Sequence, residues 1–285
     1  CLVLGAAVPL GLLLRPPAPT IHPIPIQWPE PPPPVTAADF FNRGRAYLRE
    51  GNLAEAKTDF LKSYSLSKDH RAMAFVAYSQ AALKQHTQSV AAAKLAIKDG
   101  DDSAEVYNNL GYALVQSGLP KDAIDPLGKA LGRRTRMQAA LHNRAMAWQL
   151  MGLATNAGAM NLLAADDIAV DMSRIWTSAV AGVMNLLAVD DIDAALAAGP
   201  TSSDLHFDAA QIFAACAEQK PALRAAAIDQ VKAAIRAGKD PVRCREDAIL
   251  NARLGRDRVF QDACNTPRGV PPDKIPQLRL VEPSY

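Results

Sequence analysis

The sequence contains few aromatic residues and almost no net charge. Phe, Trp and Tyr make up 6% of its 285 residues, and the formal net charge at pH 7 is +2. A chain without a basic excess lacks the electrostatic signature of nucleic-acid binding, so we expect no nucleic-acid partner. The 49% hydrophobic content comes largely from alanine. The alternating β-branched pattern of a sheet protein is missing, and this composition favours helices that pack closely on one another.

Cysteine is scarce and its spacing is not that of a metal site. Cys1, Cys216, Cys244 and Cys264 form no CxxC pair, and no histidine lies at zinc-ligand spacing from them. Free cysteine commonly behaves as a small buried apolar residue, so we expect no bound metal. A disulfide between Cys244 and Cys264 stays open for a chain in an oxidising compartment.

Sequence motifs of catalysis are also missing. The chain has no Gly-rich phosphate loop, no HExxH, no GxSxG and none of the protein-kinase signatures. A general base needs partner groups around it, and the five histidines show no partner spacing. These histidines are His22, His70, His86, His142 and His206. We therefore predict that this chain is not an enzyme and uses no cofactor.

The N-terminal part is apolar and then rich in proline. Residues 1–15 are uncharged up to Arg15, and we predict that they are the trailing part of a transmembrane helix, which needs about 20 residues. A signal-peptide core and a lipidated Cys1 are the alternatives, although no small-residue cleavage site follows. Residues 16–36 are predicted to be an extended Pro-rich linker. A Pro-rich docking ligand at residues 31–34 is the alternative.

A repeated pattern of small and large apolar residues follows the linker. Residues 104–137 place Gly111 and Ala123 where two helices of a hairpin would cross closely. Gly118 suits the left-handed residue after the first helix, and Pro120 suits the first turn of the second. The pattern recurs two periods earlier and one period later, with Gly152 in the place of Gly118. The predicted repeat-packing residues are Gly44, Ala56, Gly111, Ala123, Ala145 and Ala157.

The unit between these repeats is less regular. Ala91 and Leu95 fit a second helix, but His86 stands where a glycine is expected. Thr36, with Asp39 three residues later, is a suitable N-cap for the first helix of the array.

The period and residue pattern resemble the tetratricopeptide (TPR) repeat, which has about 34 residues per helix–turn–helix. The resemblance covers residues 37–165 and implies an all-α, TPR-type helix–turn–helix solenoid. It also implies a groove, lined by the first helix of each repeat, that binds an extended or acidic peptide or a partner protein. Phe41 stands where chaperone-tail-binding TPRs have a lysine. The candidate groove residues are Arg45, Arg49, Gln80, Lys84, Asn108, Tyr112, Gln116, His142, Asn143 and Met146.

The C-terminal part keeps helical patterns without the repeat period. Residues 160–171 recur as residues 184–195, an offset of 24. The paired aspartates of this duplication are expected in solvated turns or first helical turns, not at a metal, because adjacent residues of a helix point about 100° apart. Residues 166–265 are predicted to be degenerate helical repeats with an end cap: one pair over 204–217 and 221–238, then two short helices near 242–247 and 256–264. Residues 266–285 are predicted to be a disordered Pro-rich tail.

The order of these segments resembles the C-terminal TPR region of bacterial membrane-anchored Ser/Thr protein kinases. The features in common are the apolar segment, the Pro-rich spacer, the motifs FNRGRAYLREGNLAEA and AEVYNNLGYAL, the segment GRDRVFQ and the Pro-rich tail. The resemblance implies a kinase domain upstream of residue 1 and a membrane-anchored bacterial protein. The alternative is a freestanding membrane- or envelope-anchored TPR adaptor without a kinase.

Overall fold

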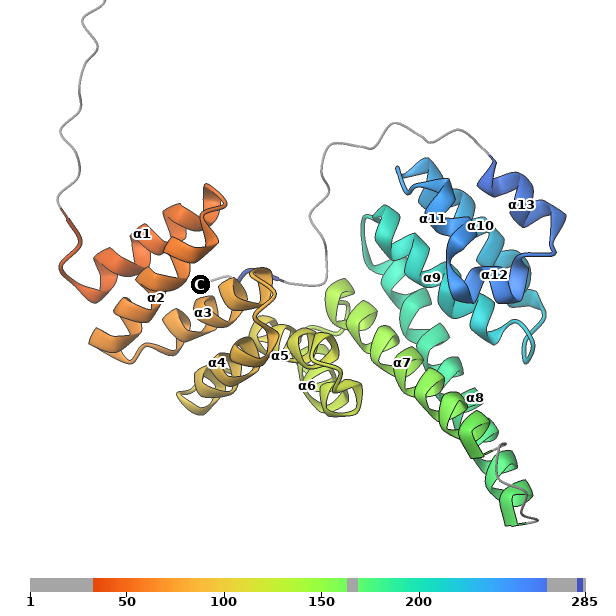
Figure 1. Ribbon diagram of the computed structural model, residues 1–285. Helices are drawn as coiled ribbons and strands as arrows, with labels where there is room; N and C mark the ends of the chain where they lie inside the picture. The colour runs from red at the N-terminus through yellow and green to blue at the C-terminus, as the bar shows by residue number, and fades with distance from the viewer. Residues whose placement is uncertain (1–32, 163–168, 266–280, 284–285) are drawn as a thin grey trace, which may run out of the picture. The chain divides into compact units, whose positions relative to one another are not determined.

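The computed structural model describes residues 33–162, 169–265 and 281–283 (Figure 1). All regular secondary structure within these ranges is α-helical, as predicted. Among the described residues, no helix combines the length and apolar character needed to cross a bilayer. The predicted transmembrane segment 1–15, nearly all of the linker 16–36 and most of the tail 266–285 lie outside the described residues.

The first six helices form three antiparallel pairs. Each helix packs against the next one along the chain, and the first helices of the second and third pairs also touch each other. The pairs are α1 (Ala37–Arg49) with α2 (Leu53–Ser67), α3 (His70–Ala82) with α4 (His86–Lys98), and α5 (Ala104–Gln116) with α6 (Pro120–Arg133).

Local sequence signals set the ends of these helices. The Thr36 hydroxyl accepts a hydrogen bond from the Asp39 amide at 3.1 Å, and the Asp39 carboxylate accepts one from the Thr36 amide at 2.9 Å. This reciprocal capping box begins α1, as Thr36 and Asp39 predict. Gly118 has a φ of +77°, the left-handed conformation that ends α5, and Pro120 is the first residue of α6.

Small residues mark the crossing point within the first and third pairs. A methyl group added at Gly44 would lie 2.9 Å from the Phe60 ring, and one added at Gly111 would collide with the side chain of Leu127. Ala56 and Ala123 have no exposed surface. Glycine on one helix therefore makes room for the large side chain of its partner.

The second pair has the same geometry with different residues, which corrects the predicted register. Lys84 has a φ of +61° and lies in the turn between α3 and α4, the place that Gly51 and Gly118 occupy in the neighbouring pairs. His86 is the first residue of α4, so it does not stand at the glycine position. Ala77 takes the place that Gly44 has one repeat earlier, and its carbonyl accepts a hydrogen bond from the Ser89 hydroxyl at 2.8 Å.

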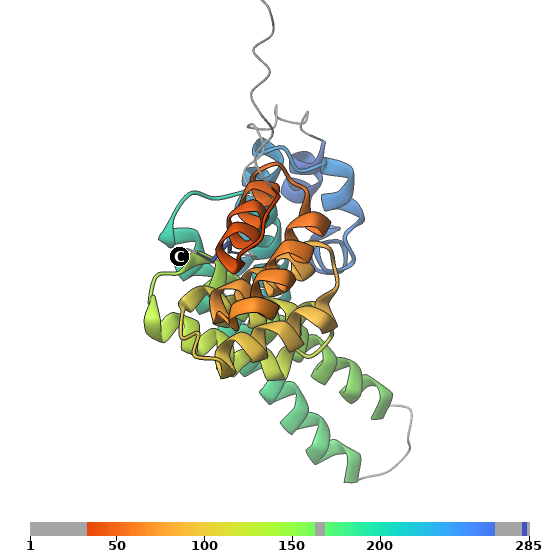
Figure 2. The same ribbon diagram turned by 90° about the vertical axis from the view of Figure 1, so that its left-hand side faces the viewer.

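The fourth pair departs from the repeat. Helix α7 (Gln138–Leu162) continues through Gly152 and packs along α8 (Ala169–Ala198), as Figure 2 shows, so the turn expected at Gly152 is absent. A methyl group at Gly152 would lie 2.6 Å from the Asn185 side-chain oxygen. This glycine thus serves a close helix–helix crossing instead of a helix end. Ala145 has no exposed surface, whereas Ala157, which was expected in a second helix, belongs to α7 itself.

The paired aspartates of the duplication fall differently from the prediction. Asp190 and Asp191 lie inside α8, not in a turn, while Asp166 and Asp167 lie outside the described residues. Asp191 is buried, and its carboxylate accepts two hydrogen bonds from the Arg144 guanidinium, at 2.7 and 2.8 Å. Within α8, Asp191 is thus placed to pair with Arg144 of α7.

The C-terminal helices form one pair and three short helices. The predicted pair and both predicted short helices are present, and α12 between them was missed. Asp240, Asp247 and Asp257 cap the three short helices through backbone amides. Cys244 and Cys264 are buried free thiols. The helices are α9 (Ser203–Cys216), α10 (Ala222–Arg236), α11 (Pro241–Glu246), α12 (Ala248–Leu254) and α13 (Arg258–Cys264).

Candidate functional site: a peptide-binding face

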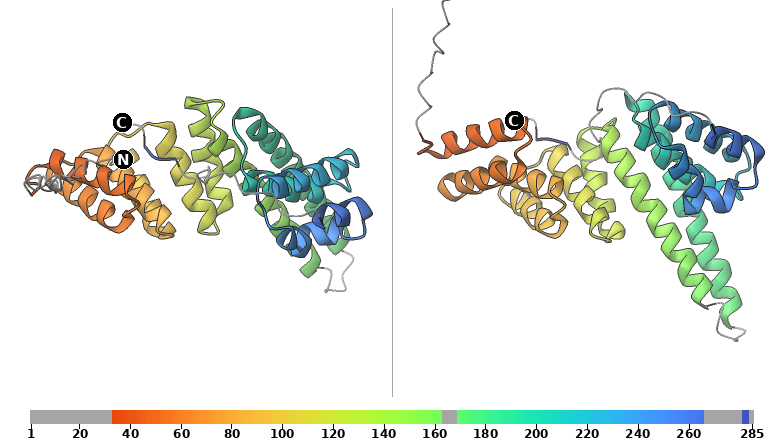
Figure 3. Two further views of the ribbon diagram at one scale, coloured as in Figure 1. Left: turned by 90° about the horizontal axis from the view of Figure 1, so that it is seen from above. Right: turned by 45° about the horizontal axis from the view of Figure 1, so that its top comes forward.

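The side chain of Asn109 on α5 holds the main chain of a segment far along the sequence. Its amide nitrogen donates to the carbonyl oxygen of Val281 at 2.7 Å, and its side-chain oxygen accepts from the Val281 amide at 3.0 Å. Figure 3 draws residues 281–283 as the short dark-blue stretch next to the C mark. Both main-chain polar groups of Val281 are thereby satisfied by a single side chain.

A chain of buried asparagines fixes the orientation of Asn109. The side-chain nitrogen of Asn143 on α7 donates to the side-chain oxygen of Asn108 at 3.0 Å. The Asn108 nitrogen donates in turn to the Asn109 oxygen at 3.2 Å. These bonds require the Asn109 nitrogen to face the Val281 carbonyl, because its oxygen is the acceptor on the other side. All three asparagines are at most 2% exposed, so the chain is held within the packed helices.

A pocket of about 440 Å³ lies between α1, α2 and α3. Arg45 lines it, and the buried Nε atom of Arg45 has no hydrogen-bond partner. Arg71 lines it from α3 and is paired with Asp69 at 2.6 Å. We call this site the Arg45 pocket; its lining residues are Ala37, Ala38, Phe41, Asn42, Arg45, Ser63, Ser67, Asp69 and Arg71.

The repeat period relates the two sites. Asn42 in the Arg45 pocket lies two repeats before Asn109. Tyr78 on α3 lies one repeat after Arg45, and Tyr112 on α5 lies one repeat after Tyr78. We refer to these five first-helix residues as the peptide face: Asn42, Arg45, Tyr78, Asn109 and Tyr112.

Tyr78 on α3 interacts electrostatically with Glu282, the residue after Val281. Burial is the main cause that raises the pKa of Tyr78, and the nearby carboxylate of Glu282 raises it further. The phenol therefore stays neutral at physiological pH beside the acidic residue of the segment. Tyr112 is half-buried and meets the His86 ring edge-on, with 5.9 Å between ring centroids.

The other predicted groove residues are scattered. Arg49 and Gln116 are exposed near the ends of α1 and α5, Gln80 is half-buried, and Met146 packs against the core. Lys84 is not on a first-helix face at all, because it lies in the turn after α3. Asn108 and Asn143 are buried, and they act behind Asn109 as described above.

His142 is part of the core and not of a groove. It is 2% exposed, and its Nε2 atom lies 2.8 Å from a carboxylate oxygen of Asp208 on α9. The side of α7 that carries His142 thus faces α9. The buried position of His142 thus differs from the exposed groove position that the repeat pattern predicts.

Sequence reasoning missed Asn42, Tyr78 and Asn109. The signal for Asn42 and Asn109 was available, since both stand two residues before the repeat glycines Gly44 and Gly111. Tyr78 was hidden by the register error in the second repeat.

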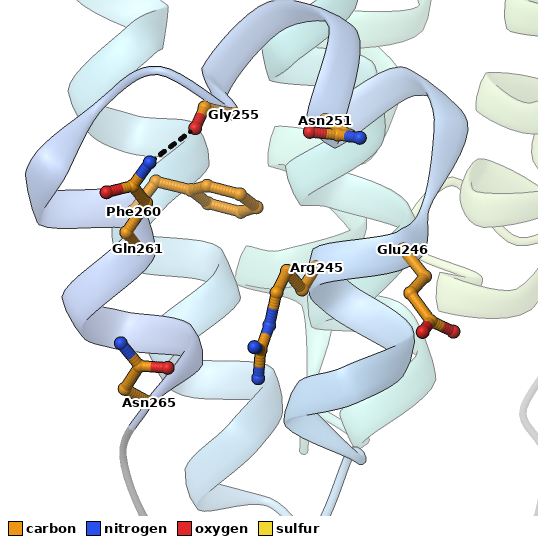
Figure 4. Close-up of a pocket in the computed structure, with 7 residues that line it drawn as sticks. All are labelled: Arg245, Glu246, Asn251, Gly255, Phe260, Gln261 and Asn265. Carbon is orange, nitrogen blue, oxygen red and sulfur yellow. Dashed lines mark hydrogen bonds between the residues drawn. The ribbon is translucent and has the colours of Figure 1, made fainter.

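A second hollow, of about 480 Å³, lies among the short helices α11 to α13. Figure 4 shows Gln261 turned toward Gly255, to whose carbonyl oxygen it donates at 2.8 Å. Phe260 belongs to the packed core, and the charged residues among those that line this hollow are one arginine, Arg245, and one glutamate, Glu246. Among the described residues, no group of three or more His, Cys, Asp or Glu side chains could hold a metal ion.

The comparisons with known proteins agree with the fold. Residues 40–70 match the profile of the tetratricopeptide repeat family. No curated protein sequence is significantly similar to the chain.

Solved structures that resemble the chain share little sequence with it. The MamA protein is 14% identical, with a TM-score of 0.49 over 70% of this chain and 90% of that one. YrrB, described as a TPR protein with an unusual peptide-binding site, is 14% identical, with a TM-score of 0.47 over 81% and 92%. The C-terminal part of a TPR protein from Cytophaga hutchinsonii is 13% identical, with a TM-score of 0.49 over 80% and 73%. The helix pairs and the family match together confirm an all-α fold built of TPR-type helix pairs.

Proposed function

We propose that this chain is a scaffold that binds extended peptide segments along the peptide face, without catalysis. The observation that carries the proposal is the pair of hydrogen bonds between the Asn109 side chain and the main-chain N–H and C=O of Val281. A contact to the main chain does not depend on the side chain of the ligand, so any extended segment offers the same two groups. Asn42, two repeats earlier, places a second side-chain amide on the same face.

The Arg45 pocket supplies the selectivity in this proposal. A buried guanidinium nitrogen without a partner favours a ligand that brings an acceptor, and a carboxylate is an acceptor that forms strong, charge-assisted hydrogen bonds with arginine. We therefore propose that acidic segments bind better than neutral or basic ones. The Phe41 ring, which also lines the pocket, adds apolar contact.

The test is the binding of fluorescein-labelled short peptides of acidic, neutral and basic composition, measured by polarisation. Arg45→Ala should weaken the acidic peptides about tenfold or more, in line with the loss of a charge-assisted hydrogen bond. Arg49→Ala is the matched control, because it removes the same charge from the same helix outside the pocket lining. Equal losses in both variants would mean that only the net charge of α1 matters.

The finer proposal concerns the larger protein. The order of the apolar segment, Pro-rich spacer, TPR-type pairs and GRDRVFQ segment supports a membrane-tethered bacterial protein with a Ser/Thr kinase domain upstream of residue 1. A freestanding anchored adaptor is the alternative. An immunoblot of the native gene product separates them: a mass far above 30.5 kDa supports the kinase, and one only slightly above it supports the adaptor.

A further inference from the structure

Residues 281–283 interact with the peptide face through both main-chain and side-chain groups. Val281 makes the two main-chain hydrogen bonds to Asn109 and packs its side chain against the hydrophobic core. Pro283 is buried. Glu282 is exposed, and the negative charge of its carboxylate helps to raise the pKa of Tyr78 on α3. The segment therefore interacts with the first helices of two successive pairs.

From these contacts we infer that residues 281–283 are a built-in ligand of the peptide face and that a foreign peptide must displace them to bind. The inference rests on the proposed function in one respect, that other peptides use the same face. Its structural half, occupancy by the chain's own segment, stands without that proposal.

The hydrogen-bonding capacity of Asn109 makes the two occupants mutually exclusive. Its side-chain oxygen accepts one hydrogen bond from the side-chain nitrogen of Asn108 and one from the main-chain N–H of Val281. These two bonds use both lone pairs of the oxygen. Its nitrogen donates to the Val281 carbonyl. A second peptide unit finds no matching pair of groups on Asn109 until Val281 has left.

Covalent attachment gives the segment an advantage over free peptides. A tethered ligand competes at an effective concentration that can reach the order of 1 mM. A free peptide with the same intrinsic contacts is therefore at a disadvantage at micromolar concentrations. A natural ligand must gain affinity elsewhere.

The Arg45 pocket is where that extra affinity is available. Its lining residues come from the range 37–71 and do not include the segment. An acidic ligand can thus anchor beside Arg45 and Phe41 first and then take the place of Val281 at Asn109. The built-in ligand works as a filter that admits peptides able to fill both sites.

The experiment compares the chain with its Val281→Pro variant, which loses the amide that donates to Asn109 but leaves every helix unchanged. The probe is a labelled peptide that copies residues 278–285, LRLVEPSY. We expect the probe to bind Val281→Pro at least ten times more tightly than the parent chain. Adding Asn109→Ala to Val281→Pro should abolish that gain, and adding Gln88→Ala, at an exposed amide on α4, should not.

A second measurement reads occupancy directly. Hydrogen exchange of the Val281 amide should be at least ten times slower in the parent than in Asn109→Ala, with circular dichroism confirming that the variant is folded. Protection that rises with protein concentration would mean that a second copy supplies the segment, which overturns the intramolecular inference.

The remaining outcomes separate the inference from the proposed function. An unprotected Val281 amide, or equal probe affinity for parent and Val281→Pro, overturns the built-in ligand even where peptides bind. The other outcome is a protected Val281 amide in the parent together with a Val281→Pro variant that binds no peptide. This result would support occupancy by the chain's own segment and would count against the general peptide-binding function.

Discussion

The side chain of Leu127 occupies the space that a Cβ atom at Gly111 would need. The two residues come from opposite helices of the third pair, and Leu127 is completely buried. The same relation holds between Gly44 and Phe60 in the first pair. Glycine is thus required at this position by its neighbour and not by its own backbone conformation.

We predict that Gly111→Ala destabilises the protein by about 1–3 kcal/mol, because Leu127 has to leave its rotamer or push the helices apart. Urea unfolding followed by far-UV circular dichroism measures the loss. Gly128→Ala on α6 is the matched control, since no atom other than those of its chain neighbours and of the nearby α6 backbone lies within 4 Å of the added methyl group. Alanine is a better helix former than glycine by about 0.5–1 kcal/mol, so the control should be stabilised. A loss of the same size in both variants would contradict the packing argument.

Lys84 carries a second prediction, because it holds a backbone conformation that suits glycine. Its φ is +61°, where a side chain costs about 1–2 kcal/mol, while glycine at the same place in the neighbouring turns has no such cost. Glycine also gives the unfolded chain more freedom, which takes back part of the gain. Lys84→Gly should therefore stabilise the protein by about 0.5–1 kcal/mol.

Gly118→Ala is the reverse experiment and should destabilise the protein by about 1 kcal/mol, since Gly118 has a φ of +77°. Thermal unfolding of both variants tests the pair. If Lys84→Gly lowered the midpoint, the side chain of Lys84 would have to make a stabilising contact that outweighs its backbone cost.

The repeat period was readable from the sequence wherever the small and large residues kept their types. Gly44 and Gly111 mark the crossings, and Gly118 marks the turn, so the first and third pairs follow from the pattern. The second pair uses Ala77 and Ser89 at the crossing and Lys84 in the turn. Its register was therefore lost, because the geometry of the pair is repeated there with other residue types.

The candidate site was less predictable, for two physical reasons. Asn108 and Asn109 are adjacent and point about 100° apart, so the choice between them depends on how α5 is rotated against α3 and α7. The partner of Asn109 is Val281, which is separated from it by 172 positions along the chain. A contact between residues so far apart in the sequence cannot be predicted from a local sequence pattern.

The fourth pair shows a further limit of sequence patterns. A glycine in an alanine-rich helix can end the helix or allow a close crossing, and the sequence around Gly152 does not distinguish these roles. The structure decides by placing Asn185 of α8 against Gly152.

Arg144 and Asp191 give the third prediction, since their ion pair joins α7 to α8. Arg144→Ala should destabilise the protein by about 1–3 kcal/mol, because the buried carboxylate of Asp191 loses two hydrogen bonds. Asp190→Asn is the control: this neighbour is exposed, and its substitution should stay within about 0.5 kcal/mol of the parent. A double-mutant cycle of Arg144→Ala and Asp191→Asn measures the coupling. Additive effects would show that the two groups do not act together.

The buried thiols give the last prediction, which concerns alkaline pH. Burial raises the pKa of Cys216 to about 11 and that of Cys244 to about 12, above the ordinary thiol value of 9.0. The folded protein therefore holds these protons more firmly than the unfolded chain does, and stability is lost as the pH rises from 9.0 toward the folded values. We expect the urea midpoint to fall across this range and to fall less steeply in Cys244→Ala, whatever its stability at neutral pH.

The comparison of slopes isolates the thiol, because Tyr64 and Tyr78, whose pKa values are also raised, titrate in the parent and in the variant alike. In a Cys1→Ser background, a thiol reagent at mildly alkaline pH should label Cys216, Cys244 and Cys264 only after unfolding, since each thiol is buried and protonated in the folded protein. Rapid labelling of the folded chain, or equal slopes in parent and Cys244→Ala, would show that these thiols open to solvent without global unfolding.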